Sequence, residues 1–182
     1  MKRLLVVTLN ISVLLAGSSL LLAKGKTVKI VIEGADLPKP IDIADPKVLP
    51  NFNVWAGPGT SSTSPSFNAN APSFIIDWSQ GPVTQVPQVL QKYRVSFYVN
   101  YQNDERIAYV VFYAYDPATR DGYVYLPGKS DQNYRLNVGT IFRGVEGNWF
   151  HAWSAWENIA RPLITKARAN SSRFEIGRST PG

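Results

Sequence analysis

The stretch that decides the fold runs from Tyr93 to Tyr125, YRVSFYVNYQNDERIAYVVFYAYDPATRDGYVY, and holds eight of the nine tyrosines. Tyrosine, valine and phenylalanine favour strands, whereas the polar segments between the apolar runs favour turns. We therefore predict three consecutive strands, at Tyr93–Tyr101, Ile107–Tyr115 and Tyr123–Leu126. Both linkers are short, and the Asp121-Gly122 pair suits a hairpin connection, so the strands should form an antiparallel meander.

Alternation along these strands separates two faces of different character. A one-residue shift of register would move every side chain to the other face, so we assume that the most apolar sets share one side. The predicted core face then holds Val95, Phe97, Val99, Ala108, Val110, Phe112, Ala114, Val124 and Leu126. The opposite face holds Arg94, Ser96, Tyr98, Asn100, Ile107, Tyr109, Val111, Tyr113, Tyr115, Tyr123 and Tyr125.

Two interpretations of this tyrosine face stay open. As a binding platform, its rings would stack on a neutral glycan or a peptide while the hydroxyls form hydrogen bonds. The contact residues would be Tyr98, Tyr109, Tyr113, Tyr115, Tyr123 and Tyr125, with Arg94 and Asn100 at the rim. As a second core, the face would instead be covered by a C-terminal helix, because large exposed apolar patches are uncommon on monomers.

The rest of the chain predicts more strands and one helix. Short apolar or alternating runs predict strands at Thr27–Glu33, Ile41–Ile43, Phe74–Trp78, Val138–Phe142 and Asn148–His151. The helix begins at Ser154-Ala-Trp-Glu157, which has the capping-box pattern. Its apolar residues recur at helical spacing, namely Trp156, Ile159, Ala160, Leu163, Ile164 and Ala167. The expected fold is α+β, a mainly antiparallel sheet with one C-terminal helix packed on it.

The N-terminal segment predicts export. Residues 1–23 combine a basic Met1-Lys2-Arg3 start, an apolar run and small residues, which is typical of a secretory signal peptide. Cleavage would follow Ser19 or Ala23, and the alternative is an uncleaved N-terminal anchor in the membrane. We expect a periplasmic or extracellular protein with one domain at 24–169, a flexible loop at 57–72 and a disordered basic tail at 170–182.

The charge of the chain argues against nucleic-acid binding. The formal net charge is +6, but residues 24–160 balance their acidic and basic side chains, so the excess lies at the two ends. A nucleic-acid binder needs basic residues gathered on a structured face. A membrane contact is expected only through an uncleaved signal or the basic tail.

Few residues suggest chemistry. The chain has one histidine and no cysteine, which excludes histidine-cluster and thiolate metal sites, and we expect neither a metal nor a cofactor. Asp77 lies between apolar residues, and Glu146 lies in a Gly-Val-Glu-Gly segment. With His151 nearby as a base, these two carboxylates would suit a hydrolase.

Three segments resemble a family of small, uncharacterised bacterial proteins, many of them exported. These are Gly122-Tyr-Val-Tyr-Leu-Pro-Gly128, Tyr134-Arg-Leu-Asn137 and Val145-Glu-Gly-Asn-Trp-Phe150. The resemblance implies a bacterial, exported, single-domain protein and implies no catalytic residue.

Two functional hypotheses follow. The first is a non-enzymatic module of the bacterial envelope or extracellular space that binds a glycan, a peptide or another envelope protein through the tyrosine face. The alternative is a secreted hydrolase of cell-wall or extracellular polymer that uses Asp77, Glu146 and His151.

Overall fold

The computed structural model describes residues 25–60, 73–85 and 90–176. Within these ranges the chain forms a seven-stranded sheet in the order β2-β1-β4-β5-β6-β7-β3, with every neighbouring pair antiparallel. The strands are β1 Thr27–Glu33, β2 Ile41–Ile43, β3 Pro82–Val83, β4 Lys92–Tyr101, β5 Asp104–Tyr115, β6 Gly122–Tyr125 and β7 Trp149–His151. The helices are α1 Tyr134–Thr140 and α2 Ser154–Ile176, with 3₁₀ turns η1 Leu49–Asn51 and η2 Trp78–Gln80.

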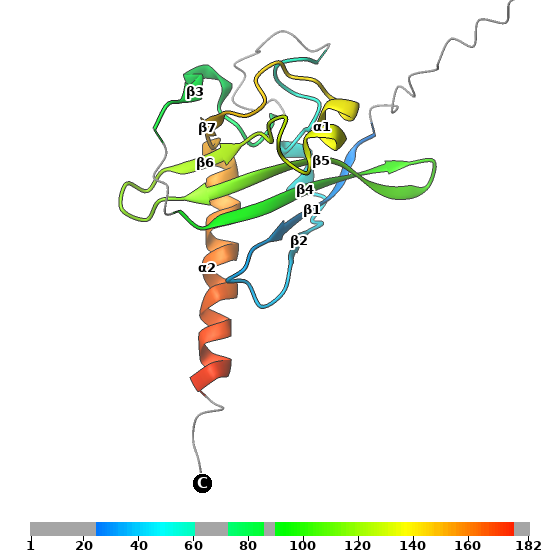
Figure 1. The fold of residues 1–182 in the computed structure, drawn as a ribbon. Coiled ribbons are helices and arrows are strands. Elements are labelled where there is room, and N and C mark those ends of the chain that lie inside the picture. Colours follow the sequence, from blue (N-terminus) through cyan, green and yellow to red (C-terminus); the bar gives the residue numbers. More distant parts are fainter. Residues whose placement is uncertain (1–24, 61–72, 86–89, 177–182) are drawn as a thin grey trace, which may run out of the picture.

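The predicted α+β fold is confirmed, because α2 packs across one face of this sheet (Figure 1). The three strands of the meander also form as predicted. The turn between β4 and β5 consists of Gln102 and Asn103, with φ of 50° and 70°. Two consecutive residues in the left-handed region match the twist of a tight hairpin, and asparagine tolerates that conformation well.

The predicted pairing of β4 with β5 is wrong by one residue over most of its length. Phe97 pairs with Tyr109 whereas Tyr98 pairs with Ile107, so Ala108 is an extra residue in β5. This β-bulge reverses the alternation beyond it. The inner face, which we define as the face toward α2, therefore holds Tyr93, Val95, Phe97, Tyr109, Val111, Tyr113 and Val124.

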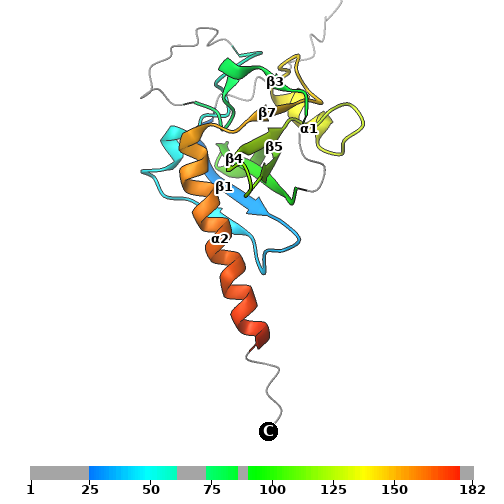
Figure 2. The same cartoon turned by 90° about the vertical axis from the view of Figure 1, so that its left-hand side faces the viewer.

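The core lies between this inner face and α2. Trp156 of α2 is fully buried, and its ring meets Tyr113 of β5 and Phe52 edge-on, at centroid distances of 6.1 and 5.3 Å. Ala160 and Ile164 continue the buried stripe of α2 at helical spacing, as the sequence predicts. Figure 2 shows α2 along one side of the sheet, with its C-terminal end extending beyond the strands.

The strand predicted at Val138–Phe142 is wrong, because Tyr134–Thr140 forms α1 beside β5. β6 pairs only with the Phe112–Tyr115 part of β5, which leaves the Val110 backbone without a strand on that side. The side chain of Asn137 takes the place of that strand. Its Oδ1 accepts from the Val110 N–H at 2.8 Å, and its Nδ2 donates to the Val110 carbonyl at 2.7 Å.

The strand predicted at Phe74–Trp78 is also absent. Within this segment the structure has an isolated bridge between Ile76 and Ala152, and η2 begins at Trp78.

Helix α2 continues to Ile176, past the end expected for the domain at residue 169. Its first turn starts from Trp153, whose carbonyl accepts from the N–H of Glu157, so Ser154 is already helical.

Several sequence-based expectations concern residues that the structure does not describe. The predicted signal segment 1–23, positions 61–72 of the predicted loop and the last six residues of the predicted tail lie outside the described ranges. Among the residues that are described, no helix combines the length and apolar character required to cross a bilayer.

Candidate binding surface

The β5 bulge divides the predicted tyrosine face between the two sides of the sheet. Tyr109 and Tyr113 point toward α2 and are fully buried. Tyr115 follows them on the same side, with the Arg161 guanidinium 4.0 Å from its ring centroid. The opposite side, the outer face, holds Arg94, Tyr98, Tyr123 and Tyr125, and Asn100 lies exposed near the tip of the β4–β5 hairpin.

Tyr109 holds a buried arginine rather than a ligand. Arg143 is 4 % exposed, and its Nε donates to the Tyr109 hydroxyl at 3.1 Å. Its other guanidinium nitrogens donate to the carbonyls of Val54, Ala56 and Pro58 at 2.6–3.1 Å. Burial raises the pKa of Tyr109 although the nearby guanidinium acts in the opposite direction, so the phenol stays neutral. This cluster fixes the segment that follows η1 against the loop after α1.

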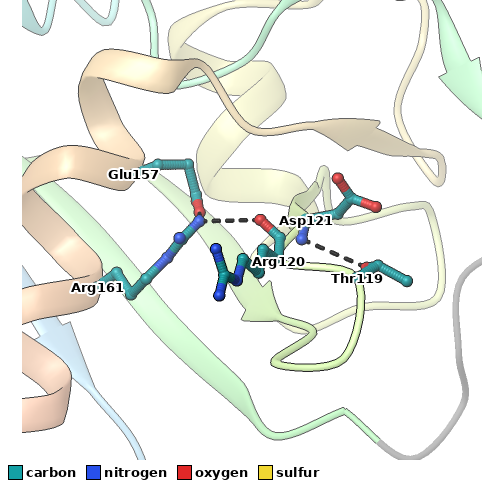
Figure 3. A network of polar contacts seen from close by, with 5 residues as sticks. All are labelled: Thr119, Arg120, Asp121, Glu157 and Arg161. Atoms are coloured by element: carbon teal, nitrogen blue, oxygen red, sulfur yellow. Dashed lines mark hydrogen bonds and ion pairs between the residues drawn. The ribbon is translucent and has the colours of Figure 1, made fainter.

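Tyr113 lies beside a second polar cluster, at the start of α2. Glu157 forms an ion pair with Arg161 one turn later, and Arg161 also donates to the carbonyl of Arg120 at 3.1 Å (Figure 3). Burial, followed by the Glu157 carboxylate, raises the pKa of Tyr113. Gly122 leaves the space for this carboxylate, because a Cβ there would lie 1.9 Å from Glu157 Oε1. The cluster ties α2 to the β5–β6 connection.

Aromatic side chains from three adjacent strands lie together on the outer face. Phe112, Tyr125 and Trp149 are cross-strand neighbours on β5, β6 and β7, with successive ring centroids 6.5 and 5.1 Å apart. Tyr123 and His151 form a second pair beside them, 5.4 Å apart. We call these five residues the aromatic patch. In Figure 1 the strands are seen from this side, and α2 passes behind them.

The rings of the patch are partly exposed and fixed in place. All but Tyr123, which is 6 % exposed, keep an intermediate share of their surface in contact with solvent. The Tyr125 hydroxyl donates to Asp131 Oδ2 at 2.8 Å, and the N–H of Gly128 donates to the same oxygen at 2.7 Å. Burial, followed by this bond, raises the pKa of Tyr125. Rigid rings of this kind lose little conformational entropy when they bind a ligand.

The cations on the outer face differ in their surroundings. Arg94 forms an ion pair with Glu33 at 2.6 Å, and Lys29 forms one with Glu105. Lys92 lies opposite Ala114, and its ammonium sits 5.5 Å from the centroid of the Trp149 ring. Within the part of the chain that the structure describes, no ion pair involves Lys92. An exposed ammonium held over an indole is available to an anionic group.

The three candidate catalytic residues support local structure. Asp77 caps η2, where it accepts from the Ser79 N–H at 3.0 Å and from the Gln80 amide at 2.7 Å. Burial of this carboxylate opposes ionisation, but the hydrogen bonds outweigh burial and lower the pKa of Asp77. Glu146 accepts from the backbone N–H of Arg143. The structure places Asp77 next to His151, whose carbonyl accepts from the Asp77 N–H at 2.9 Å.

The sequence analysis missed Lys92, Phe112 and Trp149 as candidate surface residues. The unbulged register assigns Phe112 to the core, and nothing in the sequence alone marks Lys92 as a neighbour of Trp149. A signal for Trp149 is present in the sequence. The strand predicted at Asn148–His151 follows the three-strand meander, and it can join the sheet only at a free edge, such as that of β6.

Among residues 25–60, 73–85 and 90–176, no three side chains of His, Cys, Asp or Glu are grouped to hold a metal ion.

A shallow groove lies elsewhere on the molecule. It has a volume of about 1270 Å³ and runs between residues 35–42, which include the β1–β2 connection and the start of β2, and the part of α2 around Leu163 and Ala167. An ion pair between Asp36 and Arg168, with a distance of 3.0 Å, crosses from one wall to the other. The groove shares no residue with the aromatic patch.

Comparisons with known proteins add no assignment. No protein-family model matches the sequence, and searches of curated proteins and of solved structures find no significant match.

Proposed function

We propose that this chain is an exported, non-enzymatic module that binds an extended glycan or peptide through the aromatic patch. The observation that carries the proposal is the row of Phe112, Tyr125 and Trp149 on the face of the sheet turned away from α2. Aromatic rings offer flat apolar area at low entropic cost, and they stack on the C–H faces of sugars and on peptide side chains. The signal-like segment 1–23 supports export.

Structural packing is the competing explanation for the row. Cross-strand aromatic pairs stabilise a sheet by about 0.2–1 kcal/mol each without any ligand. A purely structural role, however, does not require the rings to remain partly in solvent on the face of the sheet opposite α2. The carboxylates proposed for hydrolysis cap their own loops, which favours binding over catalysis.

The test is retention of the full chain on solid cellulose, chitin and polygalacturonate, and on a mixture of immobilised peptides. Trp149→Ser should weaken retention by about two- to tenfold, because a stacked aromatic contributes roughly 0.5–1.5 kcal/mol. Phe142→Ser is the matched control, since Phe142 is 61 % exposed and lies outside the patch. Thermal unfolding of each variant separates lost binding from lost folding.

Two outcomes would contradict the proposal. One is that the wild-type chain is retained by none of the polymers or peptides. The other is that Phe142→Ser weakens retention as much as Trp149→Ser does while both variants remain folded.

A further inference from the structure

We propose that the aromatic patch binds an acidic glycan, a chain of sugars that carry carboxylates, and that Lys92 pairs with one of those carboxylates. This inference rests on the proposed function and names its ligand class.

Among the described residues of this side of the sheet, Lys92 is a cation that no ion pair occupies. Two other basic residues of the outer face, Arg94 and Lys29, are already paired with Glu33 and Glu105. Lys92 has only the Trp149 ring beneath its ammonium among the interactions of the described residues. An anion placed there would therefore gain an ion pair without having to break one.

Carboxylates border the tyrosines of the patch, but within the described residues none of them forms an ion pair with Lys92. Asp131, which borders Tyr125, accepts hydrogen bonds from the Tyr125 hydroxyl and the Gly128 N–H on one of its oxygens. Glu33 is neutralised by Arg94. Asp121 and Asp116 lie near Tyr123, whose pKa is raised by burial and then by these carboxylates. The position that this surface offers to an anionic group is therefore beside the Lys92 ammonium, over the Trp149 ring.

The position of the patch favours a glycan over a peptide. Sheets commonly bind peptides by adding a strand at a free edge, where main-chain groups are unpaired. The patch lies in the interior of the sheet, where β5, β6 and β7 are paired with one another and offer few free backbone groups. It presents ring faces and one ammonium instead. Sugar rings with carboxylate substituents supply the C–H faces and the charge that such a surface accommodates.

The experiment compares two probes that differ chiefly in charge. Isothermal titration measures the affinity of the full chain for a hexamer of galacturonate and for the same hexamer with its carboxylates methyl-esterified. Wild-type protein should bind the acidic hexamer about two- to fivefold more tightly, which is the scale of one partly exposed ion pair. This preference should shrink as salt rises, because exposed charges are screened.

Variants then assign the preference to Lys92. Lys92→Gln should lower affinity for the acidic hexamer to that for the ester and leave the ester unchanged. Lys39→Gln, at an exposed position lining the distant groove, should change neither affinity. Trp149→Ser should weaken both hexamers, because it removes stacking rather than charge.

The outcomes distinguish this inference from the proposed function. Equal affinity for the two hexamers, or no effect of Lys92→Gln, would overturn the acidic-glycan inference. The binding module itself would survive that result if Trp149→Ser still weakened binding. Failure of galacturonate, alginate and hyaluronate oligomers all to bind would also overturn the inference. So would equal binding of poly-glutamate, since a peptide would then satisfy the same surface.

Discussion

Asn137 provides the sharpest test of how the sheet is completed. Its side-chain amide is fully buried and makes two hydrogen bonds to the backbone of Val110, at 2.8 and 2.7 Å. β6 ends before this point, so no strand pairs with Val110 on that side. Asn137→Ala would leave one buried N–H and one buried C=O without partners.

The size of the expected destabilisation follows from the two backbone groups of Val110 that lose their hydrogen bonds. Each buried backbone group that loses its hydrogen bond costs about 1–3 kcal/mol, so Asn137→Ala should lower the free energy of unfolding by about 2–6 kcal/mol. Single domains have stabilities of about 5–15 kcal/mol, so this loss is a large fraction of the total. Asn137→Asp should be at least as damaging, because it keeps the acceptor, removes the donor and buries a charge.

Urea unfolding of the full chain measures the loss. The control is Asn133→Ala, four residues earlier in the chain, because the Asn133 side chain makes no capping hydrogen bond. That control should cost less than about 0.5 kcal/mol, as surface substitutions usually do. Amide hydrogen exchange should also show faster exchange at Val110 in Asn137→Ala than in the wild type. A loss below about 1 kcal/mol, with the Val110 amide still protected, would refute the reasoning.

Two further predictions concern the inner face of the sheet. Gly122→Ala should cost about 1–3 kcal/mol in urea unfolding, because its Cβ would lie 1.9 Å from Glu157 Oε1. Most of that cost should vanish in a Glu157→Ala background, and a cost that persists in the double variant would contradict the steric explanation. Burial, followed by the hydrogen bond to Asp36, raises the pKa of Tyr93 from 10.0 to about 12. The neutral phenol is favoured in the folded state, so its contribution is complete below pH 10 and is lost as pH rises toward 12. Stability should therefore fall more steeply over this range in the wild type than in Tyr93→Phe, and equal slopes would contradict the assignment.

The strands and the long helix could be predicted because their patterns are local. Eight tyrosines among valines and phenylalanines favour extended backbone, and the spacing from Trp156 to Ile164 favours a helix with one buried stripe. α1 could not be found in this way. It spans only Tyr134–Thr140, its N-cap residue Asn133 makes no side-chain capping hydrogen bond, and its position is fixed by the hydrogen bonds of Asn137 to a distant strand.

The register of β4 and β5 could not be predicted, because both sides of β5 are apolar. Ala108, Val110, Phe112 and Ala114 alternate with Tyr109, Val111, Tyr113 and Tyr115, so hydrophobicity alone scarcely separates the two sets. A two-residue turn without a bulge would place the first set beside Phe97 and give the predicted faces. The observed bulge at Ala108 selects the second set for the core. Alternation fixes register only where one side of the strand is clearly polar.

Polar groups outside the meander explain why the bulged register is favoured. The tyrosines carry the larger rings, which fill the space beneath α2, but their hydroxyls require polar surroundings when buried. Arg143 supplies them at Tyr109, and Glu157 lies beside Tyr113. The unbulged register would direct these hydroxyls to solvent and leave the Nε of the buried arginine without its acceptor. It would also turn Phe112 inward and remove it from the aromatic patch. The same one-residue insertion therefore completes the core and creates the surface proposed to bind a ligand.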